Sequence, residues 1–215
     1  MTKNETVFKN KNSSNLNFFY SSDYWEKRYA NGGNSGSGSY NNLAKFKAEI
    51  INNFLNINKI KTVIEWGSGD CNQISLINYK QYIGYDVSKT AIDICKKKFY
   101  NDSTKMFLHI NDKFINKKKA DLSVSLDVIF HLLEDNVYNL YMKNLFDSSE
   151  KFICIYSSNY DKTTAKHVKH RKFTDWIDKY QSNIGNLKNI FQIDFPSIQK
   201  NAILHHFLIF IFMKK

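Results

Sequence analysis

The chain has 215 residues, of which 42% are hydrophobic and 24% are charged, and this composition predicts one globular domain with a sizeable core. No apolar segment is long enough for a membrane-spanning helix, and the polar residues 1–15 lead us to expect no secretory leader and no membrane partner. None of the three cysteines belongs to a Cys-x-x-Cys pair, and the histidines lack metal-ligand spacing. We therefore expect no metal and a cytoplasmic location.

The net charge of +11 has two interpretations. The lysines could simply cover a solvated surface, or they could steer an anionic small molecule or a nucleic acid toward the protein. The charge alone does not separate these two interpretations.

Alternating strand and helix patterns follow a polar start, an aromatic cluster at 18–29 and a Gly/Ser-rich loop at 31–39. They predict an α/β fold with a Rossmann-like, doubly wound, mostly parallel seven-stranded sheet that ends in an antiparallel C-terminal β hairpin. We expect residues 1–39 to form an N-terminal segment with a lid and residues 40–215 to form the main domain. The predicted helices are 43–55, 89–99, 135–147 and 171–181, and the predicted strands are 61–66, 80–86, 106–110, 121–126, 151–156, 188–194 and 203–213.

The most informative motif is a short β-branched strand that runs into Glu65 and a Gly-x-Gly turn at Gly67 and Gly69. A second strand ends at Asp86, at a distance that suits one strand–helix–strand unit. Glycines allow a tight turn and a close backbone approach to a ligand, and an acid at the end of the next strand can accept hydrogen bonds from ribose hydroxyls. The two features together indicate a bound nucleoside.

A dinucleotide-binding domain is the competing interpretation. Its fingerprint requires a third small residue in Gly-x-Gly-x-x-Gly/Ala, but Asn72 occupies that position. Glu65 would also oppose the charge of a pyrophosphate. A nucleoside ligand without phosphate suits these acids better.

At these residues the chain resembles the class I S-adenosylmethionine-dependent methyltransferases. Glu65-x-Gly67-x-Gly69 looks like their first motif, Asp86 like their ribose acid, Asn111-Asp112 like their adenine-side position, and 125–131 like their fourth motif. The resemblance covers about residues 40–160. It implies an enzyme that uses S-adenosylmethionine, releases S-adenosylhomocysteine, and contains a methyltransferase domain at 40–215.

The resemblance also implies a set of cofactor contacts. Gly67, Ser68 and Gly69 would pass under the methionine portion, and Glu65 would orient its ammonium group or hold the turn. The remaining implied cofactor residues are Asp86 at the ribose, Val87 and Asp112 at the adenine, Asp127 facing the methionine end, and Trp25 near the sulfonium. Trp66 departs from the family pattern, and it could either pack beneath the sheet or narrow the site.

A narrower resemblance joins residues 24–39, 125–133, 156–158 and 167–176 to a bacterial group of small-molecule methyltransferases. Members of that group often occur with genes for surface-polysaccharide synthesis. It implies a small acceptor, and the basic segment 166–172 favours an anionic one, a phosphorylated or nucleotide-linked precursor of a surface glycan. The expected acceptor contacts are Arg171, Tyr156 and Ser39.

Nucleic-acid methylation is disfavoured. The methyltransferases that act on the amino groups of bases usually carry an Asn/Asp-Pro-Pro-aromatic motif after the fourth strand, whereas this chain has Asp127-Val128-Ile129-Phe130. A protein substrate and a catalytically inactive nucleoside-binding protein remain as alternatives.

The general base cannot be fixed from the sequence. The candidates are His131, His167, His170 and Tyr29. His131 could equally be a structural histidine, and the basic segment 166–172 could be either a solvated surface or an anion-binding loop. The Gly/Ser loop likewise could be a flexible linker or a lid that closes on a ligand.

Overall fold

The computed structural model describes residues 20–111, 118–181, 188–194 and 207–214. The predictions for the polar start of the chain and for the adenine contact of Asp112 lie outside the described residues.

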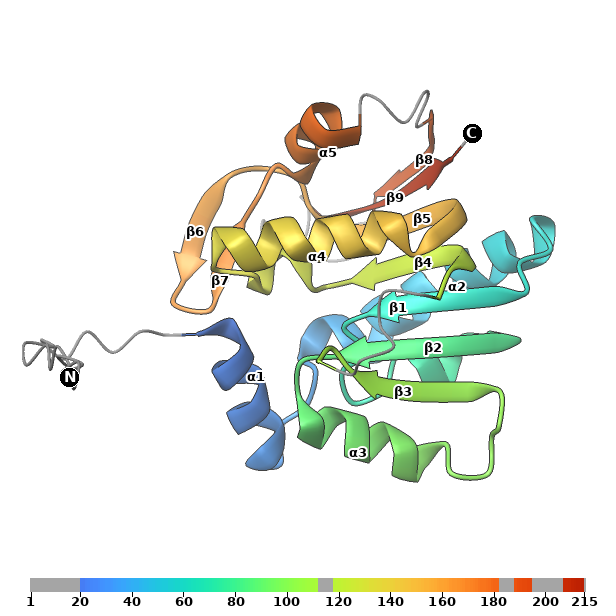
Figure 1. Ribbon diagram of the computed structural model, residues 1–215, viewed down its shortest axis with the longest axis vertical. Coiled ribbons are helices and arrows are strands. Elements are labelled where there is room, and N and C mark those ends of the chain that lie inside the picture. The colour runs from blue at the N-terminus through green and yellow to red at the C-terminus, as the bar shows by residue number, and fades with distance from the viewer. Residues whose placement is uncertain (1–19, 112–117, 182–187, 195–206, 215) are drawn as a thin grey trace, which may run out of the picture.

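One sheet of seven strands forms the centre of the molecule, in the order β3-β2-β1-β4-β5-β9-β8 (Figure 1). The strands β1 to β5 pair in parallel with one another, and β9 is antiparallel to both β5 and β8. This topology confirms the predicted fold class and the C-terminal hairpin. The strands are β1 Thr62–Trp66, β2 Gln81–Asp86, β3 Lys105–His109, β4 Ala120–Leu126, β5 Ser149–Ser158, β8 Lys188–Asp194 and β9 Phe207–Met213.

Helices cover both faces of the sheet, with α4 in front of the strands and α2 behind them in the view of Figure 1. The buried residues of α2 and α3 share one apolar cluster with one face of β1, β2 and β4, and those of α4 and α5 share a second cluster with the other face. The predicted helices are thus confirmed as α2 Asn41–Ile57, α3 Lys89–Lys98, α4 Asp135–Asp147 and α5 Phe173–Gln181.

Because side chains alternate along β1, neighbouring residues contact opposite faces of the sheet. Successive strand residues point to opposite sides of a sheet, so Glu65 and Trp66 diverge. Trp66 packs into the α4 cluster, stacked on Tyr85 at 4.7 Å between ring centroids, and its indole N–H donates to the Ser148 Oγ at 2.9 Å. Trp66 therefore packs beneath α4, although it also contributes to the cavity described below.

Two elements were not predicted. The helix α1 Ser21–Ala30 arises in the aromatic cluster, which lacks a clear helical period, and the hairpin of β6 Lys162–Ala165 and β7 Val168–His170 forms a separate small sheet in the region expected to be a basic loop. Both elements lie at the end of the sheet to which the arrowheads of β1 to β4 point (Figure 1).

The segment between β1 and β2 also differs from expectation. The strand–helix–strand spacing suggests a helix there, but the structure has only the short 3₁₀ turn η2 Ile74–Leu76. Glycine and asparagine residues in this segment favour turns over helix. Its disulfide, between Cys71 and Cys95 of α3 with Cα atoms 5.5 Å apart, ties the segment to α3. Cytoplasmic location, which rests on the cysteine pattern, stays a prediction.

No helix in the described ranges has both the length and the apolar character that crossing a bilayer requires. In the same part of the chain, no group of three or more histidine, cysteine, aspartate or glutamate side chains is arranged to hold a metal ion.

Two leucines on α4 test the assignment of its buried face. Leu145 is fully buried, whereas Leu140 is 60% exposed. We expect Leu145→Ala to lower the free energy of unfolding by about 2–5 kcal/mol, because it removes transfer free energy and leaves a cavity. The matched Leu140→Ala should change it by less than about 0.5 kcal/mol. Equal losses in urea denaturation would show that the face is assigned wrongly.

Candidate functional site

A cavity of about 440 Å³ opens at the carboxyl ends of the central strands, which is where ligands bind in sheets of this kind. Its walls come from the ends of β1, β2 and β4, the turn after β1, α1, the Gly/Ser loop, η4 Ile129–His131 and the first turns of α4. The cavity brings together most of the predicted site residues: Trp25, Tyr29, Ser39, Glu65, Gly67, Ser68, Gly69, Asp86, Val87, Asp127 and His131.

The Gly-x-Gly turn depends on glycine for a reason the sequence did not reveal. Gly67 and Gly69 have φ angles of 91° and 55°, in the region that favours glycine. A Cβ at Gly67 would lie 2.4 Å from a methyl carbon of Val128, and a Cβ at Gly69 would lie 2.3 Å from the Ser35 Oγ. The glycines therefore let two segments of the chain itself approach the turn.

Glu65 is a carboxyl group buried at the floor of the cavity, 2% exposed. The Tyr82 hydroxyl donates to its Oε2 at 2.9 Å. Burial raises the pKa of Glu65 to about 7, and the Tyr82 hydrogen bond and the charge of Lys47 only partly oppose this effect. Glu65 can therefore change its charge near neutral pH when a cation approaches.

Asp86 braces the turn from the end of β2. Its two oxygens accept hydrogen bonds from the backbone N–H groups of Gly69 at 2.8 Å and Ser88 at 2.9 Å. Burial nevertheless raises its pKa above the usual range. A carboxylate can accept about four hydrogen bonds, so Asp86 keeps capacity for a ligand in the cavity.

Lys47 is a functional candidate that the sequence reasoning missed. It is fully buried on α2, and its ammonium forms an ion pair with Asp127, which follows β4 with a φ angle of 60°. The same ammonium lies 4.8 Å from the centre of the Tyr156 ring. A lysine on the apolar stripe of the helix, one turn from Ala44 and Ile51, was the available signal. Tyr156 itself is buried beneath this pair and does not line the cavity.

Asp70 fixes the Gly/Ser loop to the turn and was also missed. Its Oδ2 accepts hydrogen bonds from the Ser35 N–H and the Tyr40 hydroxyl, each at 2.8 Å. The Ser35 Oγ in turn accepts from the Asp70 N–H and contacts the Tyr29 hydroxyl at 2.9 Å. The loop therefore packs directly on the Gly-x-Gly turn.

Two buried polar atoms in the cavity wall have no hydrogen-bond partner within the described protein: the Gln73 Oε1 and the Ser68 Oγ. Gln73 is 5% exposed, and its amide nitrogen is held by the Ala44 carbonyl at 2.9 Å. Buried polar atoms are nearly always satisfied, so these two indicate a polar ligand. The Gln73 Oε1 can only accept a hydrogen bond, and the ligand must therefore supply a donor there.

His131 lies at the opposite wall, in contact with α1 and the β6–β7 hairpin. Its Nδ1 donates to the His167 carbonyl at 2.9 Å, so in the neutral ring the Nε2 carries the lone pair. The Trp25 ring meets it edge to face at 4.8 Å. Burial lowers the pKa of His131 to about 4, against the raising effect of the His167 carbonyl. The ring is therefore neutral at physiological pH.

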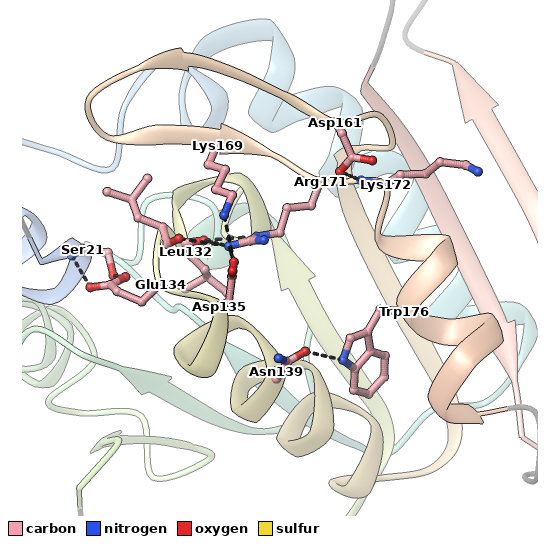
Figure 2. Close-up of polar contacts among 11 residues, drawn as sticks. Ser21, Leu132, Glu134, Asp135, Asn139, Asp161, Lys169, Arg171, Lys172 and Trp176 are labelled. Atoms are coloured by element: carbon pink, nitrogen blue, oxygen red, sulfur yellow. Dashed lines mark hydrogen bonds and ion pairs between the residues drawn. The ribbon is translucent and has the colours of Figure 1, made fainter.

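Two cations of the basic segment 166–172 bind to the start of α4. Arg171 donates to the backbone carbonyls of Leu132 and Leu133 and pairs with Asp135 at 2.7 Å, and Lys169 pairs with the same carboxylate at 2.8 Å (Figure 2). Arg171 thus clamps the hairpin to the start of α4 and does not line the cavity. Arg171 is therefore not among the proposed acceptor contacts.

The other two candidate bases in this region also lie outside the cavity lining. His170 is buried, with its Nδ1 at 2.7 Å from the Ser158 Oγ, and the ring of His167 stacks on Tyr24 at 4.7 Å. Tyr29 does line the cavity, but burial raises the pKa of its hydroxyl, which keeps the proton at neutral pH.

The fold that carries this cavity is similar to those of several solved structures. The N-methyltransferase NodS from Bradyrhizobium japonicum WM9, in complex with S-adenosylhomocysteine, is similar with a TM-score of 0.65 over 91% of this chain and 99% of that chain, at 13% identity. The chain has the fold of the class I methyltransferases.

Two further methyltransferase structures are similar. The methyltransferase domain of bacterial CtHen1-CN has a TM-score of 0.62 over 80% of this chain and 100% of that chain, at 19% identity. Magnesium protoporphyrin IX methyltransferase from Synechocystis PCC 6803 with bound S-adenosylhomocysteine has a TM-score of 0.61 over 90% and 94%, at 13% identity. Comparisons of the sequence with protein-family models and with curated proteins gave no match.

The buried ion pair in this methyltransferase fold gives a test by double substitution. We expect Lys47→Met to lower the free energy of unfolding by about 3–5 kcal/mol, because it leaves the partly buried Asp127 carboxylate without its partner. Adding Asp127→Asn should recover much of that loss, since no uncompensated charge then remains. Strictly additive effects in denaturant titrations would contradict a direct coupling between the two side chains.

Proposed function

We propose that the protein is an S-adenosylmethionine-dependent methyltransferase that acts on an oxygen or nitrogen of a small molecule. The observation that carries the proposal is one cavity lined by the unpartnered Gln73 Oε1, the buried Glu65 carboxyl and Asp86. The methyltransferase fold of the chain and the bound S-adenosylhomocysteine in two of its structural neighbours support it.

The residues fit this methyl donor. Glu65 and the Gln73 Oε1 offer acceptors to its ammonium group, and Asp86 has capacity for the ribose hydroxyls. Val87, whose carbonyl oxygen contacts the His109 Nε2 at 2.9 Å, lies in the wall where an adenine ring would follow the ribose. Ser68 and the glycines of the turn complete the donor side.

The donor supplies an electrophilic methyl group. A nucleophilic oxygen or nitrogen of the acceptor would receive this methyl group and lose a proton, and S-adenosylhomocysteine would be the other product. The protein's part is to align the reacting atoms and exclude water. Trp25, near His131 in the cavity wall, offers an aromatic face to the sulfonium.

His131 is the proposed proton acceptor. It is the only histidine among the described cavity residues, it is neutral, and its Nδ1–H bond to the His167 carbonyl leaves the Nε2 lone pair available. The His167 carbonyl positions this ring. His170 and Tyr29 then belong to the structure of the site and do not act as the base.

The Gly/Ser loop at 31–39 is proposed as the lid of this cavity, within an N-terminal segment at 1–39 that precedes the methyltransferase domain at 40–215. The hydrogen bonds of Ser35 to Asp70 hold the loop on the turn, and Ser39 lines the cavity. Donor exchange would require these bonds to open.

The expectation of an anionic acceptor rests on the basic segment 166–172. Because Lys169 and Arg171 pair with Asp135, the proposed function draws no support from them for a negative charge on the acceptor or for a role in surface-glycan synthesis.

Calorimetric titration with S-adenosylhomocysteine tests the proposal. We expect binding at one site, and we expect Asp86→Asn to weaken it by about 10- to 100-fold, because charge-assisted hydrogen bonds to the ribose are worth roughly 1.5–3 kcal/mol. Asp93→Asn, on the exposed side of α3, is the matched control and should bind normally. Absence of binding, or equal binding by both variants, would refute the proposed donor site.

The pKa of Glu65 predicts a pH dependence of the same binding. Below about pH 7 the carboxyl is largely protonated. An arriving ammonium favours the ionised form and lowers the pKa, so binding releases a proton. We expect the affinity for S-adenosylhomocysteine to rise from about pH 5.5 to 7.5 and proton release at pH 6.5, measured from the buffer dependence of the binding enthalpy.

Glu65→Gln is the control for this dependence, since an amide does not titrate. Its binding should be weaker, almost independent of pH in that range, and free of proton release. A variant that retained the proton release of the natural protein would assign the effect to another group, such as Asp86.

A further inference from the structure

The cavity is acidic in a protein whose net charge is +11. Five carboxyl groups line it, and no lysine or arginine belongs to its lining in the part of the chain that the structure describes. The nearby cations are already engaged: Lys47 with Asp127, Arg171 with Asp135, and Arg28 with the Asn34 carbonyl. The cavity therefore disfavours an anionic acceptor, which would meet negative charge without a compensating cation.

The carboxyl groups divide between the two ends of the cavity. Glu65, Asp70 and Asp86 surround the Gly-x-Gly turn, at the proposed donor side. Asp127 is balanced by the ammonium of Lys47. Glu134 remains, directly before α4, where the cavity reaches the surface.

The carboxyl group of Glu134 forms no ion pair within the described residues. Its oxygens accept hydrogen bonds from the Ser21 N–H at 3.0 Å and the Ser21 Oγ at 2.7 Å, which are neutral donors that fix its orientation (Figure 2). The ion pairs of Asp135, the next residue, leave Glu134 out. A ligand cation is thus the natural counter-charge for Glu134.

The cavity wall beside Glu134 is apolar and partly open to solvent. Tyr20, Val137 and Leu140 line this part and are 50%, 38% and 60% exposed. Large apolar side chains left exposed around a cavity mark a place where apolar surface of a ligand can be buried.

In the proposed function the unpartnered Gln73 Oε1 is satisfied by the ammonium group of the methyl donor. The polarity of the acceptor is therefore set by Glu134 and by the absence of lysine and arginine from the described cavity lining.

We propose that the methyl acceptor is a small organic amine with an apolar body, whose ammonium group pairs with Glu134 while the apolar part rests on Val137 and Leu140. This inference rests on the proposed function, because it takes the Gly-x-Gly side of the cavity as the donor's place. It replaces the anionic acceptor expected from the sequence.

The test uses protein saturated with S-adenosylhomocysteine, whose binding is established first. Hexyl, cyclohexyl and benzyl compounds, each as the amine, the alcohol and the phosphate, are then titrated at low salt by calorimetry. We expect the amine of at least one body to bind about tenfold more tightly than its alcohol, and its phosphate to bind least. Glu134→Gln should remove the preference for the amine over the alcohol and leave the affinity for S-adenosylhomocysteine unchanged.

Glu49→Gln is the matched control, because it makes the same substitution on an exposed residue of α2 outside the cavity lining. It should keep the amine preference. The inference is overturned if no amine exceeds its own alcohol and phosphate, or if Glu134→Gln retains the full preference. Failure of S-adenosylhomocysteine to bind would instead remove the proposed function, so the two results are distinguishable.

Discussion

The structure depends on how buried carboxyl groups are accommodated where the central parallel strands end. Glu65 and Asp86 are buried near the ends of β1 and β2, Asp127 lies partly buried directly after β4, and removal from water is unfavourable for each charge. Asp127 takes the buried Lys47 as its counter-ion, and Asp86 takes backbone N–H groups. Among the described residues, the Tyr82 hydroxyl is the one donor that hydrogen-bonds to Glu65, and this incomplete compensation leaves a place for a cationic ligand.

The second requirement is a cover over these groups. The Gly/Ser loop and α1 supply it, and both are anchored through side chains distant in the sequence: Ser35 on Asp70, and Glu26 on the Ser88 and Thr90 hydroxyls at the start of α3. The glycines of the turn make this close packing possible, since a Cβ at either would meet a neighbouring side chain. The Gly/Ser loop, α1 and the Gly-x-Gly turn therefore pack together as one unit.

Much of this could be predicted from the sequence because it is local. Strand and helix periodicity predicted the order and type of the sheet elements, and a local N-cap fixes the start of α3, where the Ser88 Oγ accepts from the Ala91 N–H at 3.0 Å. What could not be predicted depends on tertiary pairing. The sequence made Arg171 a candidate anion contact, but the fold pairs it with Asp135. The pairing of Lys47 with Asp127 likewise joins residues that are 80 positions apart in the sequence.

The most direct test of the central claim is a crystal structure of the protein with S-adenosylhomocysteine. We predict the ligand in the cavity, with its ribose hydroxyls within hydrogen-bond distance of the Asp86 carboxylate and its amino group against Glu65 and the Gln73 Oε1. A ligand bound elsewhere, or one in the cavity that leaves the Gln73 Oε1 and Glu65 without a donor, would contradict the account.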